Sequence, residues 1–130
     1  MILLNPTGGT IRTDAEGAGY FKAKRGNKLH RDLDFGLPKG IGQNVFSPIT
    51  GLFVRVSIPE QNDFGISGGI IEGSYATIQM FYFSPIFGLV GKNVRQGQVV
   101  GYAQDVGLIH KGCEPHIHFR LLEIDPTIFF

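Results

Sequence analysis

The chain has 130 residues, of which 42% are hydrophobic and 18% are charged, and its formal net charge is +1. This length allows one globular domain with its own core, and we expect a single domain over residues 1–130. The near-neutral charge argues against nucleic acid as the main partner, because no field of Lys and Arg is present to displace counterions from phosphates.

Two further features restrict the class of protein. No apolar run reaches the roughly 18 residues that a membrane-spanning helix needs, so we expect no membrane span. The apolar start, residues 1–4, is too short for a secretory signal, so we expect no signal peptide. Cys113 is the only cysteine, which excludes an intrachain disulfide. We interpret it as a loop residue rather than a metal ligand.

Glycine and proline divide the chain into short segments. There are 19 glycines and 7 prolines, and few windows have the apolar spacing of a helix, so the pattern predicts an all-β fold with a mainly antiparallel central sheet. Residues 1–28 are expected to form an irregular N-terminal segment. It ends in a basic run, residues 22–28, that is more typical of solvated charges than of a specific anion site.

Strands follow in the middle of the chain. Residues 45–49 and 51–58 are predicted strands around a turn at Thr50 and Gly51, and residues 59–69 are a predicted loop. Residues 70–83 predict a strand pair or one long bent strand, with a turn or bulge at 72–74. Residues 91–101 predict a tight glycine-rich turn that leads into a buried strand over 99–103, as part of a glycine-rich β-hairpin.

The last predicted strand contains two histidines. In residues 116–121 (HIHFRL), alternation places His116, His118 and Arg120 on one face and the apolar residues on the other. Two imidazoles that project in parallel from a strand with an apolar back suit a zinc site. For this short pattern alone, two surface or half-buried histidines are the commoner explanation. Arg120 is expected to be a solvated charge or a partner of a substrate carboxylate.

Residues 30–35 (HRDLDF) supply another histidine and a carboxylate four residues apart. Together with the His-X-His strand they give the donors of a two-His, one-carboxylate site, which leaves a fourth tetrahedral position open for water. The simpler alternative is an exposed His30, with Asp32 or Asp34 as a turn residue. Three of the four histidines in the chain lie in these two stretches.

Four blocks of the sequence, in the same order, resemble the lysostaphin and LytM-type zinc metallopeptidases, which cleave peptides of bacterial peptidoglycan. The blocks are residues 30–40, 45–51, 90–101 and 115–119, and the resemblance extends from about His30 to the C-terminus. It implies a single LytM-type domain with a duplicated-hybrid-motif-like fold. It also implies a Zn²⁺ ion held by His30, Asp34 and His118, with His116 as a catalytic histidine.

One position departs from that family. A further catalytic histidine of the family lies shortly before the glycine-rich hairpin, and Tyr82 occupies this place. Residues 80–86 (MFYFSPI), like the ending at 125–127, resemble the leukocyte-derived chemotaxin branch, which is similar in keeping the zinc site and is regarded as a signalling protein without peptidase activity. A tyrosine, with an ordinary pKa of about 10, is a poor base near neutral pH but can donate a hydrogen bond to an oxyanion.

His110 is the other candidate for the missing catalytic role, although an exposed loop histidine is the commoner explanation. Aromatic residues elsewhere are expected mainly in the core or in sheet packing, with a groove lining as the alternative. They are Tyr75, Phe81, Phe83 and Phe87.

Taken together, these features predict a zinc-dependent peptidoglycan endopeptidase that uses zinc-activated water, with His116 as acid and base and Tyr82 or His110 assisting. The alternative is a catalytically silent, zinc-stabilised module that binds cell-wall peptide or a protein. A lipoyl- or biotin-carrier-like domain is a weaker alternative, because it leaves the predicted ligands unexplained. The expected partner is peptidoglycan peptide. Without a signal peptide, we expect delivery to the bacterial cell wall as a virion component, together with other tail proteins.

Overall fold

The computed structural model describes residues 3–11, 32–58, 65–108 and 111–124, and the backbone of four two-residue strands between positions 13 and 29. The described residues form antiparallel β-sheets, with one 3₁₀ turn, η1 (Val106–Leu108). The predicted all-β fold class is therefore confirmed. No helix among these residues has the length and apolar character needed to cross a membrane.

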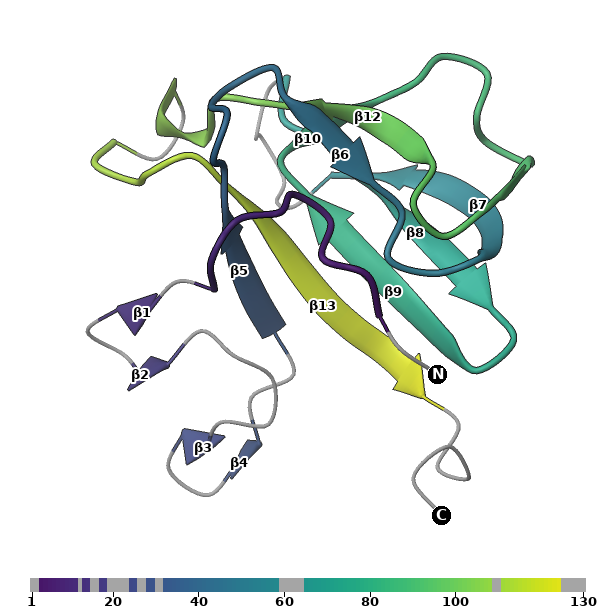
Figure 1. The fold of residues 1–130 in the computed structure, drawn as a ribbon, viewed down its shortest axis with the longest axis horizontal. Helices are drawn as coiled ribbons and strands as arrows, with labels where there is room; N and C mark the ends of the chain where they lie inside the picture. The colour runs from purple at the N-terminus through teal and green to yellow at the C-terminus, as the bar shows by residue number, and fades with distance from the viewer. Residues whose placement is uncertain are drawn as a thin grey trace.

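The main sheet has six strands in the order β11-β7-β8-β9-β13-β5, and every neighbouring pair is antiparallel (Figure 1). Its longest strand is β13 (His116–Ile124), which lies between β9 and β5. The other five strands are β5 (Asp32–Gly36), β7 (Gly51–Ser57), β8 (Gly68–Gly73), β9 (Ala76–Phe81) and β11 (Asn93–Val94).

A second sheet has three strands in the order β10-β12-β6 and lies against one end of the main sheet (Figure 1). Its strands are β6 (Asn44–Phe46), β10 (Phe83–Pro85) and β12 (Val99–Ala103). Two short ladders precede the main sheet. They pair β1 (Thr13–Asp14) with β2 (Gly17–Ala18), and β3 (Lys24–Arg25) with β4 (Lys28–Leu29).

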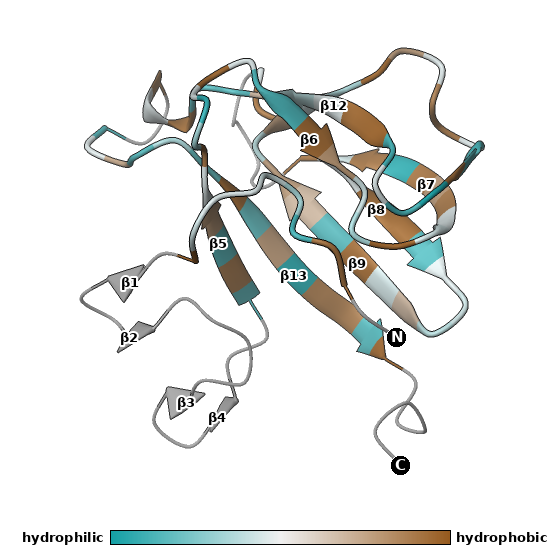
Figure 2. Ribbon diagram, viewed as in Figure 1, coloured by the Kyte–Doolittle hydropathy of each residue, from teal (hydrophilic) through white to brown (hydrophobic). Residues whose placement is uncertain are grey.

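The hydrophobic core joins residues of both sheets in one cluster. On β13 the apolar residues Ile117, Phe119 and Leu121 are at most 2% exposed, and Figure 2 shows the alternation of hydrophobic and hydrophilic residues along this strand. Burial of each such side chain contributes about 1.5–3 kcal/mol. The predicted alternation of faces is therefore confirmed, and the face that carries the histidines lies away from the core.

The N-terminal segment covers the outer edge of β5, which ends the main sheet. The Gly36 amide donates to the Thr10 carbonyl, the Thr7 hydroxyl donates to the Gly36 carbonyl, and Ile11 forms a bridge with Phe35. An uncovered edge strand offers unpaired backbone groups to other chains. Thr7, Thr10 and Ile11 therefore cover the Phe35–Gly36 end of the strand that holds both aspartates of the HRDLDF stretch.

The strand predictions agree in part. The pair within 70–83 and the strand over 99–103 are confirmed. The strands predicted over 45–49 and 51–58 correspond to β6 and β7, which belong to different sheets. The predicted loop over 59–69 is too long, since β8 begins at Gly68; a Cβ there would collide with the Met80 backbone carbonyl. Gly68, which the sequence suggested as a loop residue, is instead a glycine that lets β8 approach β9 closely.

Gly101 provides a test of how closely β12 and β10 pack within the second sheet. A Cβ at this position would overlap the backbone of Ser84 and the ring of Phe83. Because backbone atoms cannot move aside, Gly101→Ala should destabilise the fold by about 1–3 kcal/mol, as overpacking usually does. Urea unfolding measures this change.

Gly36→Ala is the matched control, since its Cβ would make an ordinary 3.6 Å contact with the Thr10 carbonyl oxygen. Its stability should stay the same or rise slightly, because alanine restricts the unfolded chain. Equal losses in both variants would contradict the close approach of β12 and β10.

Candidate metal and catalytic site

The register between β5 and β13 brings the two predicted site stretches together. His118 lies opposite Asp34, and Arg120 lies opposite Asp32. Residues two apart on a strand share a face, so all four side chains project from the same face of the sheet. Leu33 and Phe35, which alternate with the aspartates along β5, are buried on the other face. The alternative that Asp32 or Asp34 is a turn residue is therefore wrong.

Asp34 and His118 form a direct polar contact between the two strands. Nδ1 of His118 is 2.8 Å from Oδ1 of Asp34, and both side chains are about one-fifth exposed. The ring of Phe81 stacks on the imidazole, with centroids 6.2 Å apart and planes 25° apart. Donors in a tetrahedral zinc site lie about 3.3 Å apart, from bond lengths near 2.0–2.1 Å. Nδ1 of His118 and Oδ1 of Asp34 would therefore need to move only slightly apart to occupy two positions of a zinc site.

The third predicted ligand, His30, lies outside the described residues, as does the candidate His110. Among the residues that are described, no group of three or more His, Cys, Asp or Glu side chains is arranged to hold a metal ion. The contact of Asp34 with His118 supplies a carboxylate oxygen and an imidazole nitrogen, which are donors that zinc accepts. The full ligand set, His30, Asp34 and His118, stays a prediction.

His116 is buried, and its protonation can be derived from its contacts. Nδ1 lies 2.7 Å from the carbonyl oxygen of Glu114. Because a carbonyl only accepts, Nδ1 must donate, and the neutral ring keeps its lone pair on Nε2. Nε2 is 3.8 Å from Oδ1 of Asp34. The basic nitrogen therefore faces the Asp34–His118 pair, while Cys113 approaches the opposite nitrogen, with Sγ 3.8 Å from Nδ1.

Tyr82 lies directly beside His116, with ring centroids 5.1 Å apart and planes at 79°. Its φ of 77° is the only positive φ of a non-glycine residue among the described residues. A bulky residue in this region is strained, and such strain clusters at functional sites. His116 and Tyr82, two of the residues that the sequence suggested as catalytic, are therefore neighbours in the structure. Their catalytic roles remain predictions.

Hydrogen bonds hold the strained backbone of Tyr82 in place. Its amide donates to the Ser67 carbonyl at 2.8 Å, and its carbonyl accepts from the Gln104 amide at 2.9 Å. The Gln104 side chain accepts from the Ser67 amide at 2.9 Å and donates to the Gly65 carbonyl at 2.6 Å. Ser67 and Gln104 were missed from the sequence, because neither has a local signal that connects it to position 82.

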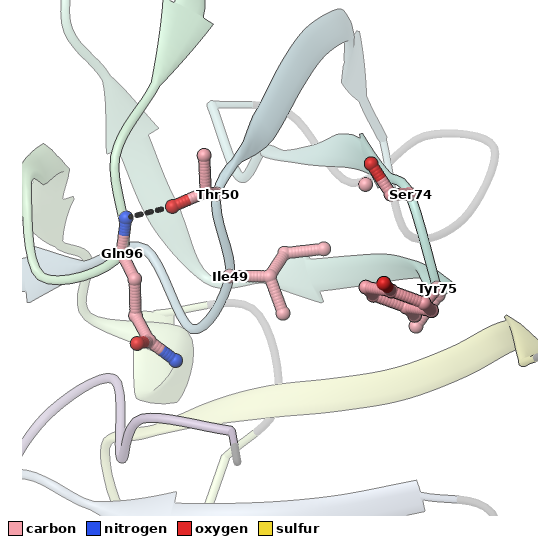
Figure 3. Close-up of a pocket in the computed structure, with 7 residues that line it drawn as sticks. Ile49, Thr50, Ser74, Tyr75 and Gln96 are labelled. Atoms are coloured by element: carbon pink, nitrogen blue, oxygen red, sulfur yellow. Dashed lines mark hydrogen bonds between the residues drawn. The ribbon is translucent and has the colours of Figure 1, made fainter. Parts of the chain in front are cut away.

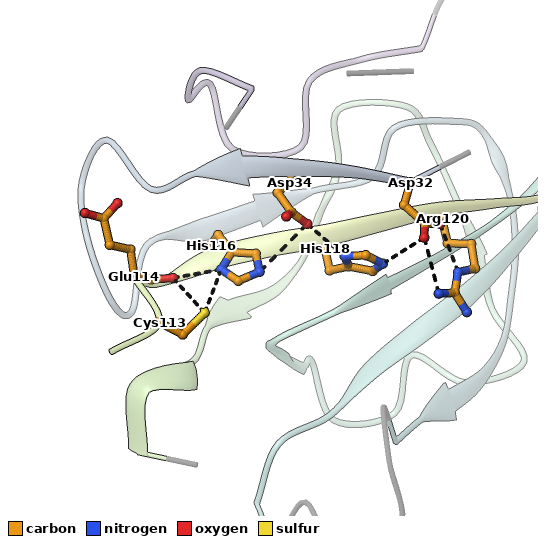
Figure 4. A network of polar contacts seen from close by, with 7 residues as sticks. All are labelled: Asp32, Asp34, Cys113, Glu114, His116, His118 and Arg120. Carbon is orange, nitrogen blue, oxygen red and sulfur yellow. Dashed lines mark hydrogen bonds and ion pairs between the residues drawn. The ribbon is translucent and has the colours of Figure 1, made fainter. Parts of the chain in front are cut away.

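Arg120 and Asp32 form a forked ion pair on the same face. Nε donates to Oδ1 at 2.9 Å, and Nη2 donates to Oδ2 at 3.3 Å. The hydrogen bond to Asp32 raises the pKa of Arg120 above its ordinary value. Figure 4 shows this pair as one end of a row of polar contacts that runs through both histidines to Glu114. Arg120 therefore has a partner within the chain, a role that the sequence did not predict.

The remaining aromatic predictions separate into two groups. Phe81 and Phe83 are buried as expected, whereas Tyr75 and Phe87 are exposed. Tyr75 lines a hollow of about 330 Å³ together with Ile49, Thr50, Ser74 and Gln96, among others (Figure 3). This hollow lies at the start of β9, whereas Tyr82 follows the other end of the strand. At about 3.3 Å per residue, the two ends are about 20 Å apart. It is separate from the candidate site.

Comparison with known proteins gives one close relative. No family model matches the chain. Leukocyte cell-derived chemotaxin-2 from Bos taurus is 31% identical over 122 residues, a match that covers 92% of this chain and 78% of the relative. This relative thus spans nearly the whole chain, including all of the candidate site.

Several solved structures share the fold. The catalytic domain of lysostaphin from Staphylococcus simulans has a TM-score of 0.55 at 24% identity, over 87% of this chain and 89% of that domain. Csd3 of Helicobacter pylori has a TM-score of 0.63 at 18% identity, over 97% of this chain and 34% of that protein. Pseudoalterin, a deep-sea M23 metalloprotease, has a TM-score of 0.57 at 16% identity, over 95% and 71%. These similarities establish a shared fold.

Gln104→Ala tests how the Tyr82 backbone is held. The variant loses the contacts to the Ser67 amide and the Gly65 carbonyl, so it should be destabilised by about 1–3 kcal/mol. It should also move Tyr82 away from His116, which would change the ring-current shift of the His116 ring protons in NMR spectra. Gln98→Ala, which removes the acceptor of the exposed Arg95 amide, is the control. An unchanged His116 shift in Gln104→Ala would contradict this role.

Proposed function

Because the chain belongs to the family of leukocyte cell-derived chemotaxin-2 and has the fold of the lysostaphin catalytic domain, we propose that it is a zinc-dependent endopeptidase of bacterial peptidoglycan. The observation that supports this proposal is the convergence of His116, Asp34 and His118 on one face of the sheet. We place its action at the bacterial cell wall. Delivery as a virion or tail component stays a prediction, which mass spectrometry of purified virions would test.

The metal of the proposed enzyme would be held by Asp34 and His118, with His30 as the third predicted ligand. A zinc ion bound there would polarise the scissile carbonyl and make water a nucleophile near neutral pH. Asp34 and His118 come from two directly paired strands, and a rigid strand pair holds ligands more accurately than a loop does. The sheet itself therefore preorganises two of the three donors.

The residues around this pair would handle protons and developing charge. Nε2 of His116 would accept a proton, because the Glu114 carbonyl keeps the ring proton on Nδ1. Tyr82, beside His116, would donate a hydrogen bond to the developing oxyanion, and a donor of this kind is worth about 10²- to 10³-fold in rate. In this proposal His116 transfers the proton, and Tyr82 stabilises charge.

A second candidate function is a catalytically silent, zinc-stabilised module that binds cell-wall peptide or a protein partner. Two observations favour it. A tyrosine contacts His116 at the place where the peptidase family is expected to have a histidine, and the relative at 31% identity is named a chemotaxin. Both candidates require the same metal site, so they differ only in whether a peptide bond is cleaved.

His116→Ala should abolish the release of soluble peptides from cross-linked murein while zinc stays bound, because His116 is assigned to proton transfer and not to the metal. The measurement is a murein-release assay together with elemental analysis of the same sample. Tyr75→Ala, at the far end of β9, is the control and should retain release. Activity that survives in His116→Ala would refute the assigned role.

Removal of zinc by a chelator should lower the melting temperature, because an ion that binds only the folded state stabilises it, by about 2.7 kcal/mol at 100 times its Kd. Readdition of zinc should restore the melting temperature. Murein release that stops with the chelator would support the endopeptidase, and zinc binding without release would support the binding module. A purified chain that binds no zinc would contradict both.

A further inference from the structure

Asp32 lies between Arg120 and His118, and it contacts both. Its Oδ1 and Oδ2 accept hydrogen bonds from Arg120, and Oδ2 is also 3.8 Å from Nε2 of His118. Asp34 contacts the opposite nitrogen of the same ring. His118 is thus placed between two carboxylates of β5, one at each ring nitrogen (Figure 4).

This arrangement distinguishes two tautomers of His118. The 2.8 Å contact with Asp34 requires a proton on Nδ1 when no metal is bound. A metal ligand must present a lone pair, so zinc binding through the nitrogen that faces Asp34 requires the ring proton to be on Nε2 instead. Among the described residues, Asp32 is the carboxylate that lies near Nε2 of His118. A carboxylate there favours the tautomer that zinc needs.

Arg120 determines which way this carboxylate points. A forked pair between guanidinium and carboxylate fixes the plane of the carboxylate as well as its position. Because Arg120 and Asp32 are cross-strand partners in the register, the fork lies directly beside the His118–Asp34 pair. The negative charge of Asp32 is held next to Nε2 without leaving an isolated anion on the sheet.

We propose that Asp32 is a positioning residue for the metal ligand His118: held by Arg120, it favours the Nε2-protonated tautomer and so raises the affinity of the site for zinc. This inference rests on the proposed function, which supplies the metal. It assigns to Asp32 and Arg120 a role in metal binding rather than in contact with substrate. Metal-ligating histidines commonly have such a partner on the other ring nitrogen, and its removal weakens metal binding by about 10- to 100-fold.

Zinc affinity measured by competition with a chromophoric chelator tests this role without any assay of catalysis. Asp32→Ala should bind zinc about 10- to 100-fold more weakly than the unmodified chain. The isosteric Asp32→Asn removes the charge with little change of shape and should lie in between, as should Arg120→Lys, which keeps the charge but loses the fork. Glu123→Ala, an exposed glutamate on the same strand β13, is the control and should bind zinc normally.

A second measurement separates positioning from stability. The ring ¹⁵N shifts of zinc-loaded His118 should show a protonated Nε2, and melting of the metal-free variants should show that Asp32→Asn still folds. Affinity in Asp32→Ala and Asp32→Asn equal to that of Glu123→Ala would overturn the inference while leaving the proposed function intact. If the unmodified chain binds no zinc, the proposed function and this inference both fail.

Discussion

The site depends on the register between β5 and β13. A slip of one residue would turn every side chain of β13 to the other face, which would point the histidines into the core and turn Ile117, Phe119 and Leu121 away from it. The core prevents this slip. Phe119 packs edge-on against Phe35 of β5, with ring centroids 6.3 Å apart, on the face opposite the polar contacts. Hydrophobic packing behind the sheet therefore fixes which carboxylate meets which histidine in front of it.

The second constraint is the passage of the chain from one sheet to the other. β9 ends at Phe81 and β10 begins at Phe83, so Tyr82 alone changes the chain's direction, and its positive φ is the local result. Ser67 and Gln104 hold this bend from two other segments. Tyr82 therefore lies beside His116 because the two sheets join there. The junction of the two sheets therefore explains both the strained backbone of Tyr82 and its place next to the candidate site.

The sequence predicted the parts of this arrangement that depend on local pattern. Alternation in residues 116–121 gave the two faces of β13 correctly, and the order of the four motif blocks gave the fold. Contacts that depend on register could not be predicted, because Arg120 and Asp32 are 88 residues apart and no local rule says which residue of one strand meets which of another. The ligand role of His30 and the catalytic role of His110 stay predictions, since both lie outside the described residues.

Tyr82 occupies the place of a catalytic histidine of the peptidase family, but this replacement does not remove the proposed base, His116. The proton on Nδ1 of His116 is fixed by the Glu114 carbonyl, which does not depend on what stands at position 82. The proposed proton acceptor, Nε2 of His116, therefore does not depend on the residue at position 82. Compared with a histidine, a tyrosine keeps the ability to donate a hydrogen bond, but near neutral pH it is a poor base and carries no positive charge. Loss of one oxyanion donor lowers a rate by about 10²- to 10³-fold, whereas loss of the base removes the proton acceptor itself. In the proposed endopeptidase, His116 and not Tyr82 is therefore the residue on which cleavage would depend.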